Sequence, residues 1–171
     1  MGPLDDLVRF EGANSGLAFR ERAYCASERA ALLRDLVALA NAGVRGPRFL
    51  FLGVSDGVGR ERSIPGITRH DWSHVKHLLA ASIEAIEPRP KVGVRALEVD
   101  GALVGMLCLE ECEDPPYLLG GDAGEGLAPG TGWVRRGTSV LPLLRRDLER
   151  LFESKARSAA AALIRIDRAK V

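Results

Sequence analysis

Cysteine is scarce in this sequence, and its spacing suits neither a disulfide framework nor a cysteine zinc site. The three cysteines are Cys25, Cys108 and Cys112, an odd number with no Cys-x-x-Cys pair. Small secreted domains that depend on disulfides carry more cysteines, usually in even numbers. The sequence therefore predicts a protein of the reducing cytoplasm. Glu110 and Glu111, between Cys108 and Cys112, predict raised thiol pKa values and poor nucleophiles.

Long hydrophobic runs and a basic leader are also missing. Met1 is followed by the acidic Asp5 and Asp6, whereas a secretory signal begins with a positive region and an apolar run. No apolar stretch reaches the roughly 18 residues that a transmembrane helix needs. We therefore expect neither secretion nor membrane insertion.

Neither sign of charge is in excess, because 24 Lys and Arg residues face 23 Asp and Glu residues, for a net charge of +1. Domains dedicated to nucleic acid are usually much more basic, so any basic surface here must be local. The sequence also has no Walker P-loop and no Gly-x-Ser-x-Gly motif. Nucleotide hydrolysis is therefore not indicated.

The chain is long enough, at 171 residues with 46% hydrophobic residues, to form one core. Residues 27–41 have apolar side chains at helical spacing, which predicts a helix capped by Ser27 and ended by a left-handed turn beginning at Asn41. Residues 49–54 are a nearly continuous apolar run, typical of a buried central strand. Residues 58–68 are rich in Gly and Arg, which favours a loop that exposes guanidinium groups.

The middle of the chain predicts a second helix followed by a hairpin. Residues 71–86 carry an apolar stripe, and Asp71 can cap the helix start. Two strand-like runs, at 92–99 and 102–109, are joined by Asp100-Gly101, a dipeptide typical of a two-residue turn with positive φ at both positions.

The last third of the chain is less regular. Residues 110–132 contain acidic residues, prolines and glycines, which favours a long surface loop. Residues 133–137 resemble a strand, and residues 143–157 repeat leucines at helical spacing. Residues 158–171 fit either a continued helix or a strand at 162–166.

Six short motifs in a fixed order carry a resemblance to a known family. They are residues 17–20 (LAFR), 36–42 (LVALANA), 51–57 (FLGVSDG), 65–67 (PGI), 115–117 (PPY) and 133–139 (WVRRGTS). In this order they resemble the Schlafen-type AlbA-like domain family. The resemblance implies an α+β fold with a two-layer mixed sheet and packed helices, and DNA or RNA as the partner. With it we expect an N-terminal lead at 1–10, the domain at 11–157 and a C-terminal extension at 158–171.

The same resemblance implies a possible nuclease activity, because some Schlafen relatives cut structured RNA such as tRNA. Such enzymes use a cluster of carboxylates to hold Mg or Mn, which neutralises phosphate charge. The two glutamates of the family motif are replaced here by Ala13 and Ala18, and Asp56 alone matches the family's acidic position. We therefore predict no cofactor and no metal-dependent cleavage. The alternatives are that Asp56 serves a divergent endoribonuclease acting on tRNA or rRNA, or that it accepts backbone hydrogen bonds in a turn.

The nucleic-acid-binding candidates are arginines that we expect to share one face near the strand ends: Arg20, Arg60, Arg62, Arg69, Arg135 and Arg136. Arginine forms two parallel hydrogen bonds to phosphate, so several such contacts make binding sensitive to salt. For any one of these arginines, a solvated surface role is the plainer alternative. Trp133 could stack on a base, but partial burial is the commoner role of such a residue.

Two further possibilities concern metals and protein partners. His70, His74 and His77 have helical spacing but no matched carboxylate or cysteine, so no metal site is predicted. The segment 110–132 could bind a protein partner, which leaves a protein-interaction module as a further alternative. The leucines at 144, 148 and 151 could close a homodimer or cover the domain's own sheet.

Overall fold

The computed structural model describes the backbone of residues 3–56, 62–110, 112–121, 123 and 126–168, and side chains up to residue 157. In chain order the elements are α1 (Pro3–Phe10), β1 (Leu17–Arg20), η1 (Ala26–Glu28), α2 (Arg29–Ala40), β2 (Arg48–Leu52), α3 (Arg69–Ser82), η2 (Ile83–Ala85), β3 (Ile86–Glu87), β4 (Lys91–Val99), β5 (Ala102–Glu110), β6 (Leu118–Leu119), β7 (Trp133–Arg136), β8 (Ser139–Pro142) and α4 (Arg145–Arg168). The predicted α+β class is confirmed. Arg60 lies outside the described residues.

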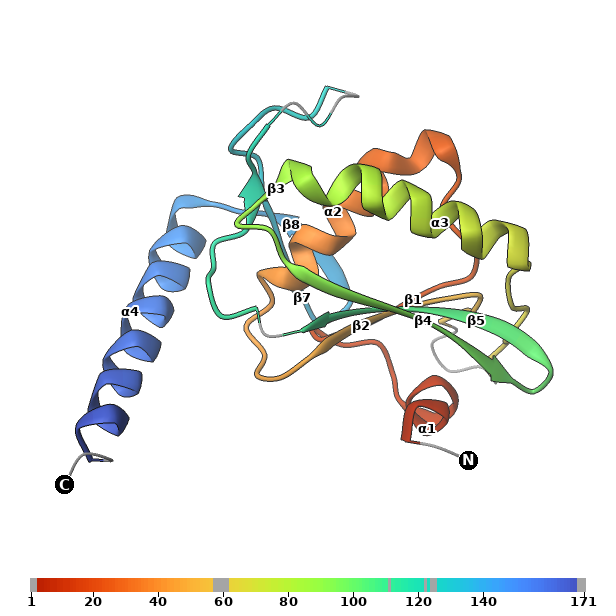
Figure 1. The fold of residues 1–171 in the computed structure, drawn as a ribbon, viewed down its shortest axis with the longest axis horizontal. Helices are drawn as coiled ribbons and strands as arrows, with labels where there is room; N and C mark the ends of the chain where they lie inside the picture. Colours follow the sequence, from red (N-terminus) through yellow and green to blue (C-terminus); the bar gives the residue numbers. More distant parts are fainter. Residues whose placement is uncertain (1–2, 57–61, 111, 122, 124–125, 169–171) are drawn as a thin grey trace.

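A mixed four-stranded sheet in the order β1-β2-β5-β4 forms the centre of the fold. β1 and β2 are parallel, while β2 with β5 and β5 with β4 are antiparallel. Helices α2 and α3 lie over one face of the sheet and α1 lies against the other (Figure 1). The sheet therefore has a cluster of buried apolar side chains on each face.

Strand β2 is buried on both faces, as its continuous apolar sequence predicts. Leu50 and Leu52 point to the α2 side, whereas Phe51 points to the α1 side and stacks with Phe19 and Phe49 at ring-centroid distances of 5.7 and 6.1 Å. Alternating side chains of one strand thus join the two apolar clusters.

The predicted hairpin is confirmed in detail. β4 and β5 pair along their whole length, and the connecting Asp100 and Gly101 have φ values of 54° and 75°. A two-residue turn with positive φ at both positions matches the right-handed twist of the two strands that it joins.

Both helix starts differ from the predictions. The first helix is preceded by the 3-10 turn η1, and Ser27 lies inside that turn instead of capping α2. The second helix is capped by Thr68, and Asp71 completes a reciprocal capping box at the third helical position. α2 ends at Ala40, and its C-cap residue Asn41 is not left-handed, because its φ is −86°. The Asn41 side chain bonds instead to distant backbone groups.

The segment 110–132 is less exposed than predicted, because Tyr117, Leu119 and Ala123 are buried. β6 pairs with β3, and the buried Asn41 amide donates from Nδ2 to the carbonyls of Tyr117 at 2.7 Å and of Trp133 at 2.9 Å. The loop is therefore fastened to the core at several points.

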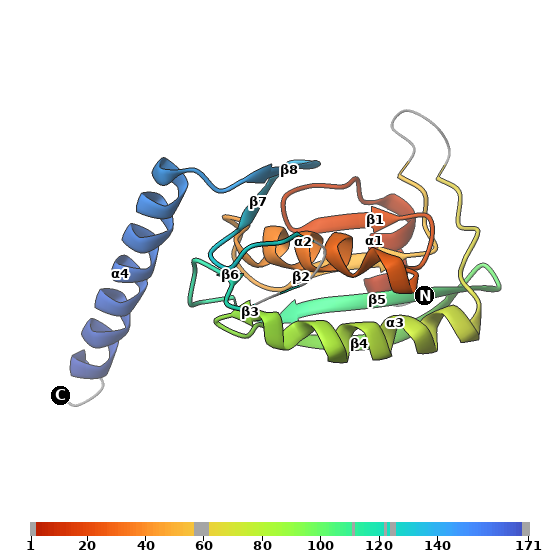
Figure 2. The same ribbon diagram turned by 90° about the horizontal axis from the view of Figure 1, so that it is seen from above.

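The two ends of the chain are helical. The ten-residue lead contains α1, whose Leu4, Leu7 and Val8 pack on the sheet. The predicted strand at 133–137 is confirmed as β7, which pairs with β8, and α4 then continues through residue 168 and stands apart from the sheet (Figure 2). The strand alternative at 162–166 is therefore wrong. Within the described part of the chain, we find no helix long and apolar enough to cross a membrane.

Candidate functional site

Three of the predicted arginines gather around the outer side of β1. Arg20 is the last residue of this strand, Arg135 comes from β7, and Arg62 precedes α3. Because β1 is at the edge of the sheet, its outer side is free to meet side chains from distant parts of the chain. The structure thus brings together arginines that are far apart in the sequence.

A small cavity of about 100 Å³ lies at this edge. Its walls are formed by Ala18, Phe19, Arg20, Asp35, Leu39, Leu50, Arg135 and Val140. The apolar members come from the sheet, α2 and β8, while two arginines and one carboxylate supply all the charged groups. A cavity of this size can hold several water molecules or one small polar group.

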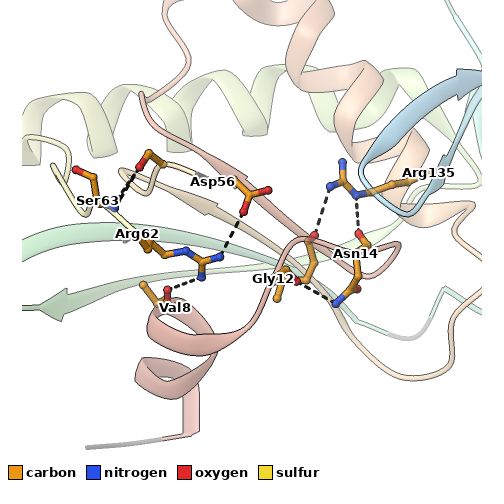
Figure 3. Close-up of polar contacts among 9 residues, drawn as sticks. Val8, Gly12, Asn14, Asp56, Arg62, Ser63 and Arg135 are labelled. Carbon is orange, nitrogen blue, oxygen red and sulfur yellow. Dashed lines mark hydrogen bonds and ion pairs between the residues drawn. The ribbon is translucent and has the colours of Figure 1, made fainter. Parts of the chain in front are cut away.

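Arg135 is buried although it is charged, and its guanidinium is hydrogen-bonded to backbone carbonyls. Only 9% of its surface is exposed, and its guanidinium donates from Nε to the Asn14 carbonyl at 2.8 Å and from Nη2 to the Leu17 carbonyl at 3.4 Å (Figure 3). No described residue accepts a hydrogen bond from Nη1. Burial lowers the pKa of Arg135, and the nearby carboxylates of Asp35 and Asp56 oppose that effect. Arginine nevertheless stays protonated in proteins, so this is a buried cation with one free donor group.

Arg20 is restrained in a different way. Its guanidinium is ion-paired with Glu28 and lies 4.2 Å above the ring of Tyr24. Its Nε is buried and has no hydrogen-bond partner among the described residues. The pKa of Glu28 is lowered, mainly by the backbone N–H of Cys25. Arg20 therefore has a charge that is partly neutralised and one unused donor.

Asp35 was not predicted from the sequence. It is half-buried on α2, and one carboxylate oxygen accepts a hydrogen bond from the Tyr24 hydroxyl at 2.6 Å. Burial raises the pKa of Tyr24 well above its usual range, and the Asp35 charge adds to the effect. The sequence signal was the Arg34-Asp35 pair, which interrupts an otherwise apolar helix.

Asp56 and Arg62 form a second polar contact next to the first. Nη2 of Arg62 lies 3.3 Å from Oδ1 of Asp56, and Nη1 donates to the Val8 carbonyl at 2.7 Å (Figure 3). The guanidinium also lies 4.0 Å over the ring of Phe19. With 14% of its side chain exposed, Arg62 is not the solvent-facing group that the loop composition predicted. Asp56 therefore pairs with a guanidinium, and its predicted turn role concerns residues 57–61, which lie outside the described part of the chain.

The remaining predicted arginines lie elsewhere. Arg136 projects from the other face of β7 and is ion-paired with the buried Asp147 of α4. The pKa of Asp147 is lowered, chiefly by the backbone N–H of Leu144. Arg69 is exposed at the first position of α3. The expectation that all six arginines share one face is therefore wrong for Arg136.

The other candidate ligands and nucleophiles are not assembled into a site. Within the described part of the chain, no group of three or more His, Cys, Asp and Glu side chains is placed to hold a metal. His70 was predicted to lie before the helix, but it is an exposed residue within α3. Nε2 of His74 is buried and has no hydrogen-bond partner among the described residues. Burial raises the pKa of Cys108 and of Cys112, and Glu110 adds to the effect at Cys108.

Both tryptophans serve in packing. Trp72 is buried against β5, and Trp133 is partly buried against the α2 side of the core. No base-stacking surface is therefore formed by an exposed tryptophan.

Comparison with solved structures supports the fold. The chain resembles the N-terminal domain of a RecG-related protein, named for the ATP-dependent DNA helicase RecG, from Nitrosomonas europaea, with a TM-score of 0.52 and 16% identity over 80% of this chain and 87% of the other. A second structure is the DIP2311 protein from Corynebacterium diphtheriae, with a TM-score of 0.47 and 19% identity over 75% of this chain and 22% of the other.

No protein-family model matches the sequence, and no curated protein matches it significantly. The first structural likeness shows that the fold is shared with a RecG-related N-terminal domain.

Proposed function

We propose that this chain is a nucleic-acid-binding domain that contacts phosphate groups of DNA or RNA through Arg20 and Arg135. The observation that carries the proposal is the cavity at the edge of β1, which both guanidinium groups line: Nε of Arg20 is buried without an acceptor, and Nη1 of Arg135 has no acceptor among the described residues. Buried donors are usually hydrogen-bonded, and a phosphate oxygen is the acceptor that guanidinium groups bind best.

Two further observations support this direction. The ordered motifs that resemble the Schlafen-type AlbA-like family include the segments that carry Arg20 and Arg135. The neighbour with the shared fold is named for a DNA helicase. Neither observation depends on the cavity.

The two carboxylates near Arg135 set the expected strength of binding. Asp35 and Asp56 both act on the Arg135 charge, so they weaken the local attraction for an anion. We therefore expect modest affinity that falls steeply with salt. Asp35→Asn keeps an oxygen that can accept from Tyr24 and removes the negative charge, and should tighten binding.

The test is fluorescence anisotropy with labelled duplex DNA, single-stranded DNA and structured RNA over a salt series. Arg20→Gln should weaken binding of every ligand and lower the salt slope by about one. Arg135→Lys keeps the charge but loses the forked donors, so it should also weaken binding. Arg145→Gln is the matched control, because Arg145 is exposed on α4 and does not line the cavity.

The same samples, incubated with Mg or Mn and examined on a gel, test the endoribonuclease alternative. Cleavage of tRNA or rRNA that disappears in Asp56→Asn or Asp35→Asn would replace the binding proposal with an enzymatic one. A wild-type chain that binds no nucleic acid at low salt would contradict the proposal and favour the protein-interaction module.

A further inference from the structure

Strand β4 has an open outer edge along its whole length. It is the last strand of the main sheet, and its nine residues pair only with β5. No described residue forms a hydrogen bond with its outer side. A long strand with free N–H and C=O groups is a template for another strand.

The hairpin geometry shows which residues of β4 present these groups. The two-residue turn makes Val99 and Ala102 a hydrogen-bonded pair, because the carbonyl before such a turn accepts from the N–H after it. Alternate residues of β4 then bond to β5, and the residues between them point outward. The outward backbone groups therefore belong to Val92, Val94, Ala96 and Glu98.

We infer that two copies of this chain associate through β4, in an antiparallel pair centred on Val94. In this register Val94 lies opposite Val94 of the second copy, and Val92 lies opposite Ala96. The pairing forms about six backbone hydrogen bonds. It also covers Val94, whose side chain is 45% exposed although it is apolar.

Charge favours this register over its neighbours. A pair centred on Arg95 places two arginines opposite each other, and one centred on Gly93 places Lys91 opposite Arg95, both of which are repulsive. The pair centred on Val94 places Arg95 opposite Gly93 of the second copy.

The surroundings of Gly93 supply a partner for that arginine. A Cβ atom on Gly93 would lie 3.3 Å from Oε1 of Glu110, so the Glu110 carboxylate lies over this glycine. Arg95 and Glu110 are on the sheet face opposite α2 and α3, as their alternation with Leu97 and Cys108 shows. The two-fold pairing therefore forms two ion pairs between Arg95 of one copy and Glu110 of the other.

The first experiment measures the mass of the full chain by light scattering across a concentration series. The wild type should form a dimer, and Val94→Pro should raise its dissociation constant at least about tenfold by removing an outward N–H without disturbing the β5 ladder. Arg95→Glu and Glu110→Arg should each weaken the dimer, and the double variant should restore it. Arg22→Glu, an exposed charge reversal outside β4, is the control.

A monomer at every concentration would overturn the inference. So would a dimer that withstands both Val94→Pro and Arg95→Glu. The charge exchange keeps the test decisive if the proline variant fails to fold.

Crosslinking tests the register. In a background of Cys25→Ser and Cys108→Ser, Val94→Cys should form a disulfide between copies under mild oxidation, because its two Cα atoms lie about 5.5 Å apart. Ala96→Cys should react much more slowly, since it faces Val92. Faster reaction at position 96 would contradict the Val94 register, and no reaction at either would contradict the edge pairing.

Discussion

The two outer strands of the central sheet differ in what meets their free edges. β1 has four residues, and its outer side is met by Asn14 and by the guanidinium of Arg135. β4 has nine residues and no described partner on its outer side. In both strands, the outward-facing N–H and C=O groups have no partner within the sheet itself, because each strand lies at an edge.

This difference suggests that one sheet can present two kinds of binding surface. At β1, side chains from α2 and β7 close over the edge and bring buried charges, which suits a small anionic group such as phosphate. At β4 the backbone itself stays accessible, which suits another strand. The predictions below test whether the two sides of the molecule are independent.

The largest expected effect comes from Asn41→Ala, on the β1 side. Asn41 is 1% exposed, donates to the carbonyls of Tyr117 and Trp133, and accepts from the Tyr117 N–H at 2.7 Å. Its loss leaves buried groups without partners and should lower the free energy of unfolding by about 3 kcal/mol. Urea denaturation measures this loss.

Asn41→Ala should also weaken nucleic-acid binding, because Asn41 fixes β7, which carries Arg135, to the end of α2. Dimerisation through β4 should persist wherever the variant is folded. Equal loss of both properties would show that the two edges are not independent.

The next largest effect is expected for Gly105→Ala, on the β4 side. An added Cβ would lie 2.7 Å from ring atoms of Trp72, so α3 would have to shift away from the sheet. Overpacking of this kind should cost about 1–3 kcal/mol in unfolding free energy. Gly43→Ala is the control, since nothing lies within 4 Å of its added Cβ. A cost no larger than that of the control would show that α3 is free to move.

A smaller effect is expected for Arg62→Gln. This change removes the hydrogen bond to the Val8 carbonyl and the contact over the Phe19 ring. Thermal unfolding should show a loss of about 1 kcal/mol, together with faster hydrogen exchange in α1. Unchanged exchange in α1 would mean that its apolar face alone holds it on the sheet.

The smallest effect is a pH dependence at Asp147. Its pKa is lowered in the folded state, so its contribution to stability is present above the unfolded pKa and is lost as pH falls through the folded value. The difference in melting temperature between the wild type and Asp147→Asn should therefore be largest near neutral pH and should shrink in acid. A difference that is constant with pH would contradict the role of the Asp147 charge.

The elements that the sequence predicts well are those with a local cause. The hairpin follows from Asp100-Gly101, and β2 follows from its apolar run, because each signal depends on neighbouring residues only. α1 was predicted as a lead, since eight residues give too short a pattern to separate from a loop. β1, with four residues, was matched only through the family resemblance.

The candidate site was predicted only in part because it depends on tertiary structure. Arg20 and Arg135 were candidates, but their sharing one cavity requires β1 and β7 to approach from positions far apart in the chain. Asp35 looks like an ordinary solvent-facing helix residue until Tyr24 is placed beside it. The hydrogen bond of Arg62 to the Val8 carbonyl of α1 and the ion pair of Arg136 with Asp147 of α4 depend on tertiary structure in the same way.

The most direct measurement of the central claim is an NMR titration of arginine Nε–H resonances with a short single-stranded DNA. The account predicts that the Nε–H signals of Arg20 and Arg135 shift together with added ligand, while that of Arg95 on the opposite edge does not. Shifts confined to arginines outside the cavity, such as Arg69, would contradict the assignment of phosphate contacts to the β1 edge.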